Sequence, residues 1–161
     1  MTEWPPVLNA YDFFLAERLR EGRGGDPALR LDDRIVTYNE VEGLTSGFTN
    51  ALHDGGVTHG ERVLLVMPDS PQYAAGLLAT MRLGAVFVMV NPGLTVETMS
   101  AIVDQSQAAA AVVHPSYLDH FNAAEPSWRP YVIDPTSVAA SSVGQPMVET
   151  VPDDPVMWLF S

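Results

Sequence analysis

Short, uninterrupted apolar runs alternate with segments of helical periodicity from residue 62 onward. The apolar runs are RVLLVM (62–67), AVFVMV (85–90), AAAVV (109–113) and YVI (131–133). Continuous apolar runs of this length are typical of strands that are covered on both faces, as in a parallel sheet. Helices are predicted between them, over residues 71–82, 96–105 and 115–121. This order predicts an α/β fold, with a mostly parallel sheet flanked by helices and joined by right-handed crossovers.

A small unit is predicted ahead of this sheet. A helix begins after its N-cap Asn9 and continues to about Glu21. Helical spacing predicts one apolar face on it, made of Tyr11, Phe14, Leu15 and Leu19. Two β-prone runs, ALRL and RIVTY, follow the helix and are joined by Asp32-Asp33, which predicts a β-hairpin.

Capping residues mark the ends of several predicted helices. Thr37 and Glu40 fit a capping box, in which the threonine hydroxyl accepts a backbone N–H and the glutamate reaches back. The helix that they start ends at Gly55-Gly56. Its predicted core residues are Val41, Leu44, Phe48, Ala51 and Leu52. Two further N-caps and one C-terminal glycine are predicted for the later helices, at Ser70, Thr95 and Gly84.

The last part of the chain changes character. Residues 134–150 show no period and are rich in Ser, Pro and Ala, which predicts a surface connection. After them VMWLF (156–160) predicts one more strand of the buried type, directly followed by Ser161. Since domains usually finish on a surface helix or a polar tail, we expect a chain that is interrupted in mid-fold.

Composition limits the classes of function. The chain has 161 residues, enough for one domain, and 47% of them are apolar. Its net charge of −12 includes eight arginines and no lysine, and such a surface repels nucleic acids and anionic membranes. The absence of cysteine excludes disulfides and thiolate chemistry. The opening MTEWPPVLNA lacks the build of a signal peptide, and we expect a cytoplasmic protein.

No catalytic motif or metal-ligand spacing is present, so we predict neither catalytic nor metal-binding residues in this chain. Three predicted strand ends, at 67–71, 90–95 and 113–116, are where α/β proteins usually bind ligands. None contains the glycines that let backbone wrap a phosphate, so we interpret them as capped turns. The pair Asp153-Asp154 is interpreted as part of a solvated linker, and His53 and His59 as solvated loop residues.

Four segments, in this order, resemble the start of the adenylate-forming superfamily of acyl- and aryl-CoA ligases: IVTYNEV (35–41), NALHDGGVTHGERVLLVMPDSPQY (50–73), MRLGAVFVMVNPGLT (81–95) and PDDPVMWLFS (152–161). The family commonly has a lysine two residues before the glycine of the third segment, and Arg82 stands there. The early segment NAYDFFLAERLREGRGGDPAL and the ending are most similar to benzoate- and hydroxybenzoate-CoA ligases.

The resemblance implies that residues 1–161 are a partial AMP-binding domain, truncated at the start of the phosphate-binding loop. Ser161 would be the first hydroxyl residue of that loop. The complete enzyme would use ATP and Mg²⁺ to adenylate a carboxylate and CoA to form the thioester. This chain would act as scaffold, without a cofactor of its own, and its partner would be the remainder of the ligase.

Two other interpretations remain open. A stand-alone, non-enzymatic module could associate with itself or with another protein through apolar surface left uncovered. A small doubly wound nucleotide-binding protein would show the same alternation of strands and helices, although fold analogy alone is poor evidence for function.

Overall fold

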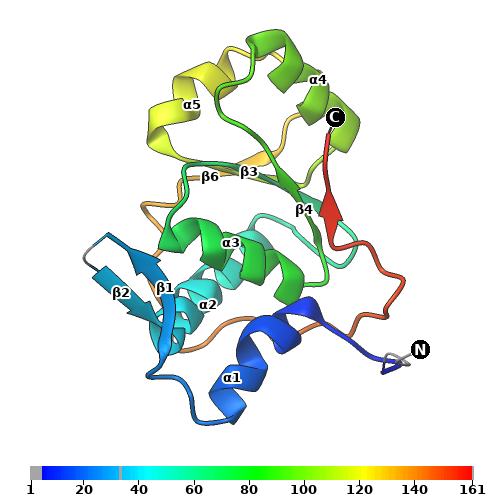
Figure 1. Ribbon diagram of the computed structural model, residues 1–161. Coiled ribbons are helices and arrows are strands. Elements are labelled where there is room, and N and C mark those ends of the chain that lie inside the picture. The colour runs from blue at the N-terminus through cyan, green and yellow to red at the C-terminus, as the bar shows by residue number, and fades with distance from the viewer. Residues whose placement is uncertain (1–4, 33, 161) are drawn as a thin grey trace.

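The computed structural model describes residues 5–32 and 34–160. A five-stranded, entirely parallel sheet lies at the centre of the molecule, with the strand order β6-β5-β3-β4-β7 (Figure 1). Its strands are β3 (Arg62–Val66), β4 (Val86–Met89), β5 (Ala110–Val113), β6 (Tyr131–Ile133) and β7 (Met157–Trp158). The predicted α/β fold with a parallel sheet is confirmed.

Helices cover both faces of the sheet. Helices α2 (Tyr38–Asp54) and α3 (Pro71–Arg82) lie on one face, and α4 (Val96–Ser106) and α5 (Pro115–Asn122) lie on the other (Figure 1). Alternate residues of β3 enter different cores, because successive side chains of a strand point to opposite faces. Val63 and Leu65 pack with the α2 and α3 side, whereas Leu64 and Val66 pack with the α4 and α5 side.

Local signals place the helix ends where the sequence predicts them. The Thr37 hydroxyl accepts from the backbone N–H of Glu40, whose carboxylate accepts from the Thr37 N–H at 2.7 Å, completing the capping box. The Ser70 hydroxyl caps α3 by accepting from the Tyr73 N–H, and the Thr95 hydroxyl caps α4 by accepting from the Thr98 N–H. Gly84 follows the end of α3 with a φ of +64°, a left-handed conformation that glycine adopts without steric cost.

The N-terminal unit packs below α2 and α3 (Figure 1). It contains a π-helical turn η1 (Asp12–Ala16), the short helix α1 (Glu17–Arg20) and the antiparallel pair β1 (Pro27–Leu31) and β2 (Arg34–Thr37), which confirms the predicted helix and hairpin. One prediction is wrong: Phe14 is 55% exposed instead of lying on the buried face with Tyr11 and Leu15. The π turn changes the angle between successive residues, so α-helical spacing no longer describes which side chains share a face.

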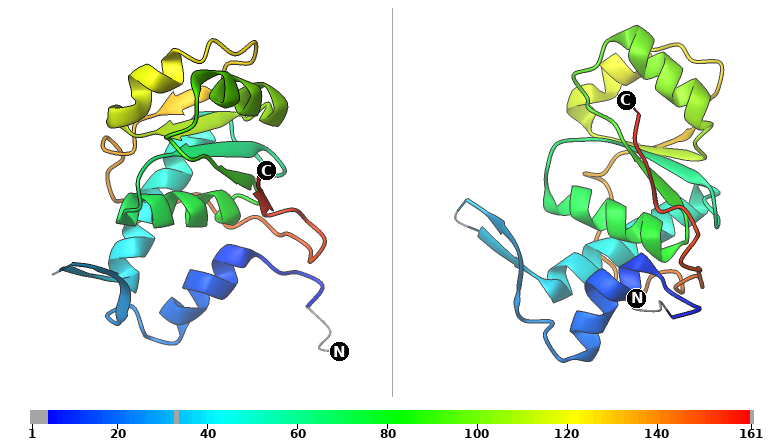
Figure 2. Two further views of the ribbon diagram at one scale, coloured as in Figure 1. Left: turned by 45° about the horizontal axis from the view of Figure 1, so that its top comes forward. Right: turned by 45° about the vertical axis from the view of Figure 1, so that its right-hand side comes forward.

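The last apolar run, 156–160, contains a strand as predicted. Strand β7 is two residues long and lies beside β4 at one edge of the sheet (Figure 2). Among the described residues no strand pairs with its other side, and Met157, Trp158 and Leu159 are exposed. The stretch 134–150 contains no regular element, in agreement with its prediction as a connection. None of the helices within the described ranges has the length and hydropathy that a membrane crossing requires.

Candidate functional site

The carboxyl edge of the sheet is the first candidate, because neighbouring strands there send the chain to opposite faces. β3 continues into α3 on one face, and β5 continues into α5 on the other. Open α/β sheets usually bind ligands at such a point. A cavity of about 100 Å³ lies there, lined by Met67, Pro68, Ser70, Gln72, His114, Pro135 and Thr136.

Most polar groups of this cavity already have partners within the chain. The Ser70 hydroxyl oxygen accepts from the Tyr73 N–H at 3.1 Å, and Nδ1 of His114 accepts from the Ser116 N–H at 3.2 Å. The Thr136 hydroxyl donates to an Asp134 carboxylate oxygen at 2.8 Å. These contacts support the interpretation of the strand ends as capped turns.

The loop after β4 is built in the same manner. The Asn91 side-chain oxygen accepts from the Gly93 N–H at 2.9 Å, and the Thr95 hydroxyl accepts from the Thr98 N–H. Nε2 of His120 lies 2.7 Å from the carbonyl oxygen of Leu94, which ties this loop to α5. His120 therefore has a structural role, since it connects the loop after β4 to α5 on the face of the sheet that α4 and α5 cover.

The described residues place few groups at the carboxyl edge that could stabilise phosphate charge. Stabilising phosphate charge requires cations or several free backbone N–H groups. The residues that line the cavity include no arginine, and side-chain caps accept from the N–H groups of Tyr73 and Ser116 in the two nearby turns. Ser161, the residue predicted to open a phosphate loop, lies outside the described residues. Within the described ranges no three His, Asp or Glu side chains gather as metal ligands would.

A second candidate is a polar cluster around Arg82, at the end of α3. Its guanidinium donates from Nη1 to the Glu42 carboxylate at 2.9 Å, to the Ser46 hydroxyl at 3.3 Å and to the Tyr11 hydroxyl at 3.4 Å. It also lies 5.0 Å from the centre of the Tyr11 ring, within cation–π range. Among the described residues, Nε of Arg82 is buried without a hydrogen-bond partner. The cluster joins the N-terminal helical segment to α2 and α3.

The electrostatics of this cluster favour a neutral tyrosine. Burial, followed by the charge and hydrogen bond of Glu42, raises the pKa of the Tyr11 phenol above its usual value. Tyr11 donates to Glu42 at 2.9 Å, as a neutral phenol can. Since Arg82 is 13% exposed and lines neither the carboxyl-edge cavity nor the cleft described next, we assign this cluster a structural role.

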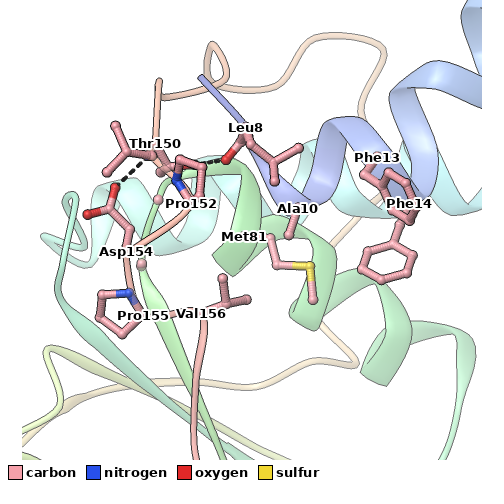
Figure 3. A pocket seen from close by; sticks show the side chains of 13 residues that line it. Leu8, Ala10, Phe13, Phe14, Met81, Thr150, Pro152, Asp154, Pro155 and Val156 are labelled. Carbon is pink, nitrogen blue, oxygen red and sulfur yellow. Dashed lines mark hydrogen bonds between the residues drawn. The ribbon is translucent and has the colours of Figure 1, made fainter. Parts of the chain in front are cut away.

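The third candidate is an apolar cleft of about 250 Å³ at the opposite, amino edge of the sheet (Figure 3). It lies between the N-terminal segment with Phe13 and Phe14, the end of α3 at Met81, and the segment 150–156. Two hydrogen bonds between Leu8 and Thr150 join the N-terminal segment to the segment 150–156. The Leu8 N–H donates to the Thr150 carbonyl at 2.9 Å, and the Thr150 hydroxyl donates to the Leu8 carbonyl at 2.5 Å.

Asp153 and Asp154 lie in the irregular, mostly exposed segment that leads to β7, in agreement with their interpretation as part of a linker, and Asp154 also fixes a turn beside this cleft. The Asp154 carboxylate accepts from the Val151 N–H at 2.9 Å and lies 3.4 Å from Nε2 of His59. The Val151 hydrogen bond and then His59 lower the pKa of Asp154. Sequence reasoning missed the cleft, because it is built from three segments far apart in the chain. The one local feature that could have indicated it is the adjacent pair Phe13-Phe14. Two neighbouring residues rarely share one helix face, so an apolar pair of this kind indicates apolar surface beyond the buried face.

Comparison with known proteins matches residues 16–161 to the family described as AMP-binding enzyme. The 3-hydroxybenzoate--CoA/4-hydroxybenzoate--CoA ligase of Thauera aromatica is 30% identical over 169 residues, covering 96% of this chain and 32% of the relative. An acetyl-coenzyme A synthetase of Vibrio parahaemolyticus is 39% identical over 89 residues, covering 55% of this chain and 13% of the relative.

Solved structures share the fold. A benzoate CoA ligase from Burkholderia xenovorans superimposes with a TM-score of 0.78 and 26% identity, covering 94% of this chain and 32% of the other. An anthranilate CoA ligase in complex with anthranoyl-AMP gives a TM-score of 0.82 at 24% identity, covering 98% and 32%. These matches cover nearly all of this chain. The chain therefore spans about a third of the length of these ligases.

Proposed function

The chain belongs to the AMP-binding enzyme family, and we propose that it serves as the first α/β subdomain of an ATP-dependent aryl-CoA ligase. In this role it is a scaffold and does not catalyse the reaction alone. The complete enzyme would adenylate an aromatic carboxylate with ATP and Mg²⁺ and transfer the acyl group to CoA. The similarity to a hydroxybenzoate-CoA ligase over 96% of the chain carries the proposal.

The carboxyl edge of the sheet supports the scaffold role. The residues lining its cavity include no arginine, and the side chains of Ser70 and His114 cap the turns that follow β3 and β5. Such loops are well suited to hold strand ends in position for a phosphate-binding element that another segment supplies. We propose that Ser161, which follows β7, begins that element.

ATP–pyrophosphate exchange tests the proposal directly. The 161-residue chain is assayed with benzoate, 3-hydroxybenzoate, 4-hydroxybenzoate and acetate, and we expect the exchange rate of a blank without protein. A chimera that continues the chain with the matching remainder of the Thauera aromatica ligase is the positive control. We expect it to exchange with the hydroxybenzoates and less with acetate.

The two parts of the proposal fail separately. Exchange by the 161-residue chain above the blank would overturn the scaffold role. A chimera that folds with the circular dichroism of an α/β protein but shows no exchange with any aromatic acid would overturn the assignment to an aryl-CoA ligase.

A further inference from the structure

The apolar cleft at the amino edge of the sheet has no part in the proposed scaffold role. Met81, at the end of α3, lies between Ala10 and Val156 in Figure 3, and all three side chains line the cleft. Phe13 and Phe14 border it, with their rings 5.2 Å apart and close to perpendicular. Concave, mostly apolar surfaces of this kind are the usual form of small-molecule sites in proteins.

Hydrogen bonds hold the three segments around the cleft in place. The Asn9 side chain is buried, and its Nδ2 donates to the Met81 carbonyl at 2.9 Å and to the Val148 carbonyl at 2.8 Å. The two hydrogen bonds between Leu8 and Thr150 add to this connection. The cleft therefore exists before a ligand binds, and binding to a preformed site loses little free energy to the ordering of its walls.

The chemistry of the lining selects an uncharged ligand. Asp154 is the one charged residue among the described residues that line the cleft, and its carboxylate accepts from the Val151 N–H (Figure 3). The Thr150 hydroxyl already donates to the Leu8 carbonyl. A bound anion would lose its hydration without meeting a cation, and the net charge of −12 would repel it as well.

The size and the side chains of the cleft indicate an aromatic ring. Its volume of about 250 Å³ exceeds the roughly 150 Å³ of an apolar cavity that binds benzene, which leaves room for a short substituent. Aromatic rings favour edge-to-face and offset contacts such as Phe13 and Phe14 offer, and the Met81 thioether also contacts rings favourably. We propose that the cleft is a binding site for a small uncharged aromatic molecule, a single ring with a short substituent.

This site is separate from the carboxyl edge of the sheet, where the proposed phosphate-binding element begins. β7 is parallel to β4, so the chain runs from Val156 at the cleft toward the carboxyl edge. The cleft and the carboxyl edge therefore lie at opposite ends of the strands. The cleft is a second site and not the pocket for the carboxylate substrate of the proposed ligase.

The methyl signals of isotope-labelled methionines test the proposal by nuclear magnetic resonance. Benzyl alcohol, an uncharged ring with a short substituent, is titrated to about 20 mM, because a ligand of this size binds with a dissociation constant on the order of 1 mM. We expect the Met81 signal, identified by its loss in Met81→Leu, to shift and saturate. The signals of Met67 and Met99 should not move, since these side chains are buried in the cores on the two faces of the sheet. Benzoate, which has the same ring and a negative charge, should bind at least about tenfold more weakly.

Three variants locate the bound molecule. Ala10→Phe fills the cleft with a ring from the chain itself and should raise the dissociation constant of benzyl alcohol at least about tenfold. Ala101→Phe is the matched control, because it makes the same change at an exposed alanine of α4, and it should leave the dissociation constant unchanged. Phe14→Ser removes one border of the cleft and should also weaken binding. Circular dichroism and the melting temperature show whether each variant keeps the native fold.

The same titration of the chimera with the Thauera aromatica remainder shows whether the cleft stays open in a complete ligase, and we expect the Met81 signal to shift there as well. No saturating shift in the 161-residue chain, equal affinity for benzoate, or equal effects of Ala10→Phe and Ala101→Phe would overturn the proposal. So would a shift that is present in the 161-residue chain and absent from the folded chimera, because the following chain would then cover the cleft.

Discussion

Removing either partner of the Arg82–Glu42 pair, which joins α3 to α2, should be strongly destabilising. The side chains of Arg82 and Glu42 are 13% and 25% exposed, so the pair lies mostly out of water. Arg82→Met keeps much of the apolar stem and removes the guanidinium. It leaves the Glu42 carboxylate with the hydroxyls of Ser46 and Tyr11, both at 2.9 Å, and without a cation.

The expected magnitude follows from this geometry. Removing one partner of a buried ion pair costs about 3–5 kcal/mol, because the other charge is left buried and uncompensated. Since Glu42 retains some exposure and two hydroxyl donors, we expect about 3 kcal/mol for Arg82→Met. We expect about 2–3 kcal/mol for Glu42→Gln, which leaves the guanidinium without its carboxylate. Against a total stability of about 5–15 kcal/mol for a domain, each loss is large.

A double-mutant cycle in urea measures the pair itself. The double variant Arg82→Met/Glu42→Gln removes both charges, so its loss of unfolding free energy should be smaller than the two single losses together by about 1.5–3 kcal/mol. Additivity within about 0.5 kcal/mol would refute the reasoning, because it would mean that the two charges do not interact in the folded state.

Two further predictions concern helix α2. Gly47→Ala places a Cβ against the carbonyl oxygen of Ala139 and should lower the free energy of unfolding by about 1–3 kcal/mol. Gly43→Ala meets only the Cβ of Ala140 at 3.5 Å and should leave the free energy of unfolding unchanged or raise it. Urea unfolding of both variants measures this difference, and equal effects would contradict the close approach at Gly47. The Thr37 N–H, and then its hydroxyl, lower the pKa of Glu40 from 4.5, so this carboxylate stabilises the fold above about pH 4.5 and loses that contribution as the pH falls through its lowered pKa. Glu40→Gln should have a lower melting temperature than the parent above about pH 4.5, and the difference should shrink in more acidic buffer; a constant difference would exclude the titration of Glu40 as its cause.

Short-range patterns predicted most of the central fold. The strands β3, β4 and β5 lie within the predicted apolar runs, because a strand buried on both faces needs apolar residues at every position. The caps Thr37, Ser70 and Thr95 were predicted for a similar reason, since each acts on N–H groups within three residues of itself.

The candidate sites were predicted less completely. The strand ends were identified as capped turns, and the contacts of Ser70 and His114 support that interpretation. The apolar cleft, the contacts of Asp154 and the exposure of Phe14 were not predicted. The cleft and the contacts of Asp154 depend on segments separated by many residues, and the exposure of Phe14 depends on the π turn. Contacts between distant segments and a π turn leave no regular period in the sequence.

The amino-acid sequence by itself determined which segments become strands and helices, where the helices begin, and the family to which the chain belongs, because these depend on neighbouring residues and on motifs in order. Only the tertiary structure decided that β7 pairs with β4, that Arg82 is held by Glu42 and Tyr11, and that an apolar cleft lies between the N-terminal segment and the end of α3. An apolar run such as 156–160 predicts a strand, but which strand it pairs with depends on how segments far apart in the chain meet in space. Local sequence carries no information about that pairing.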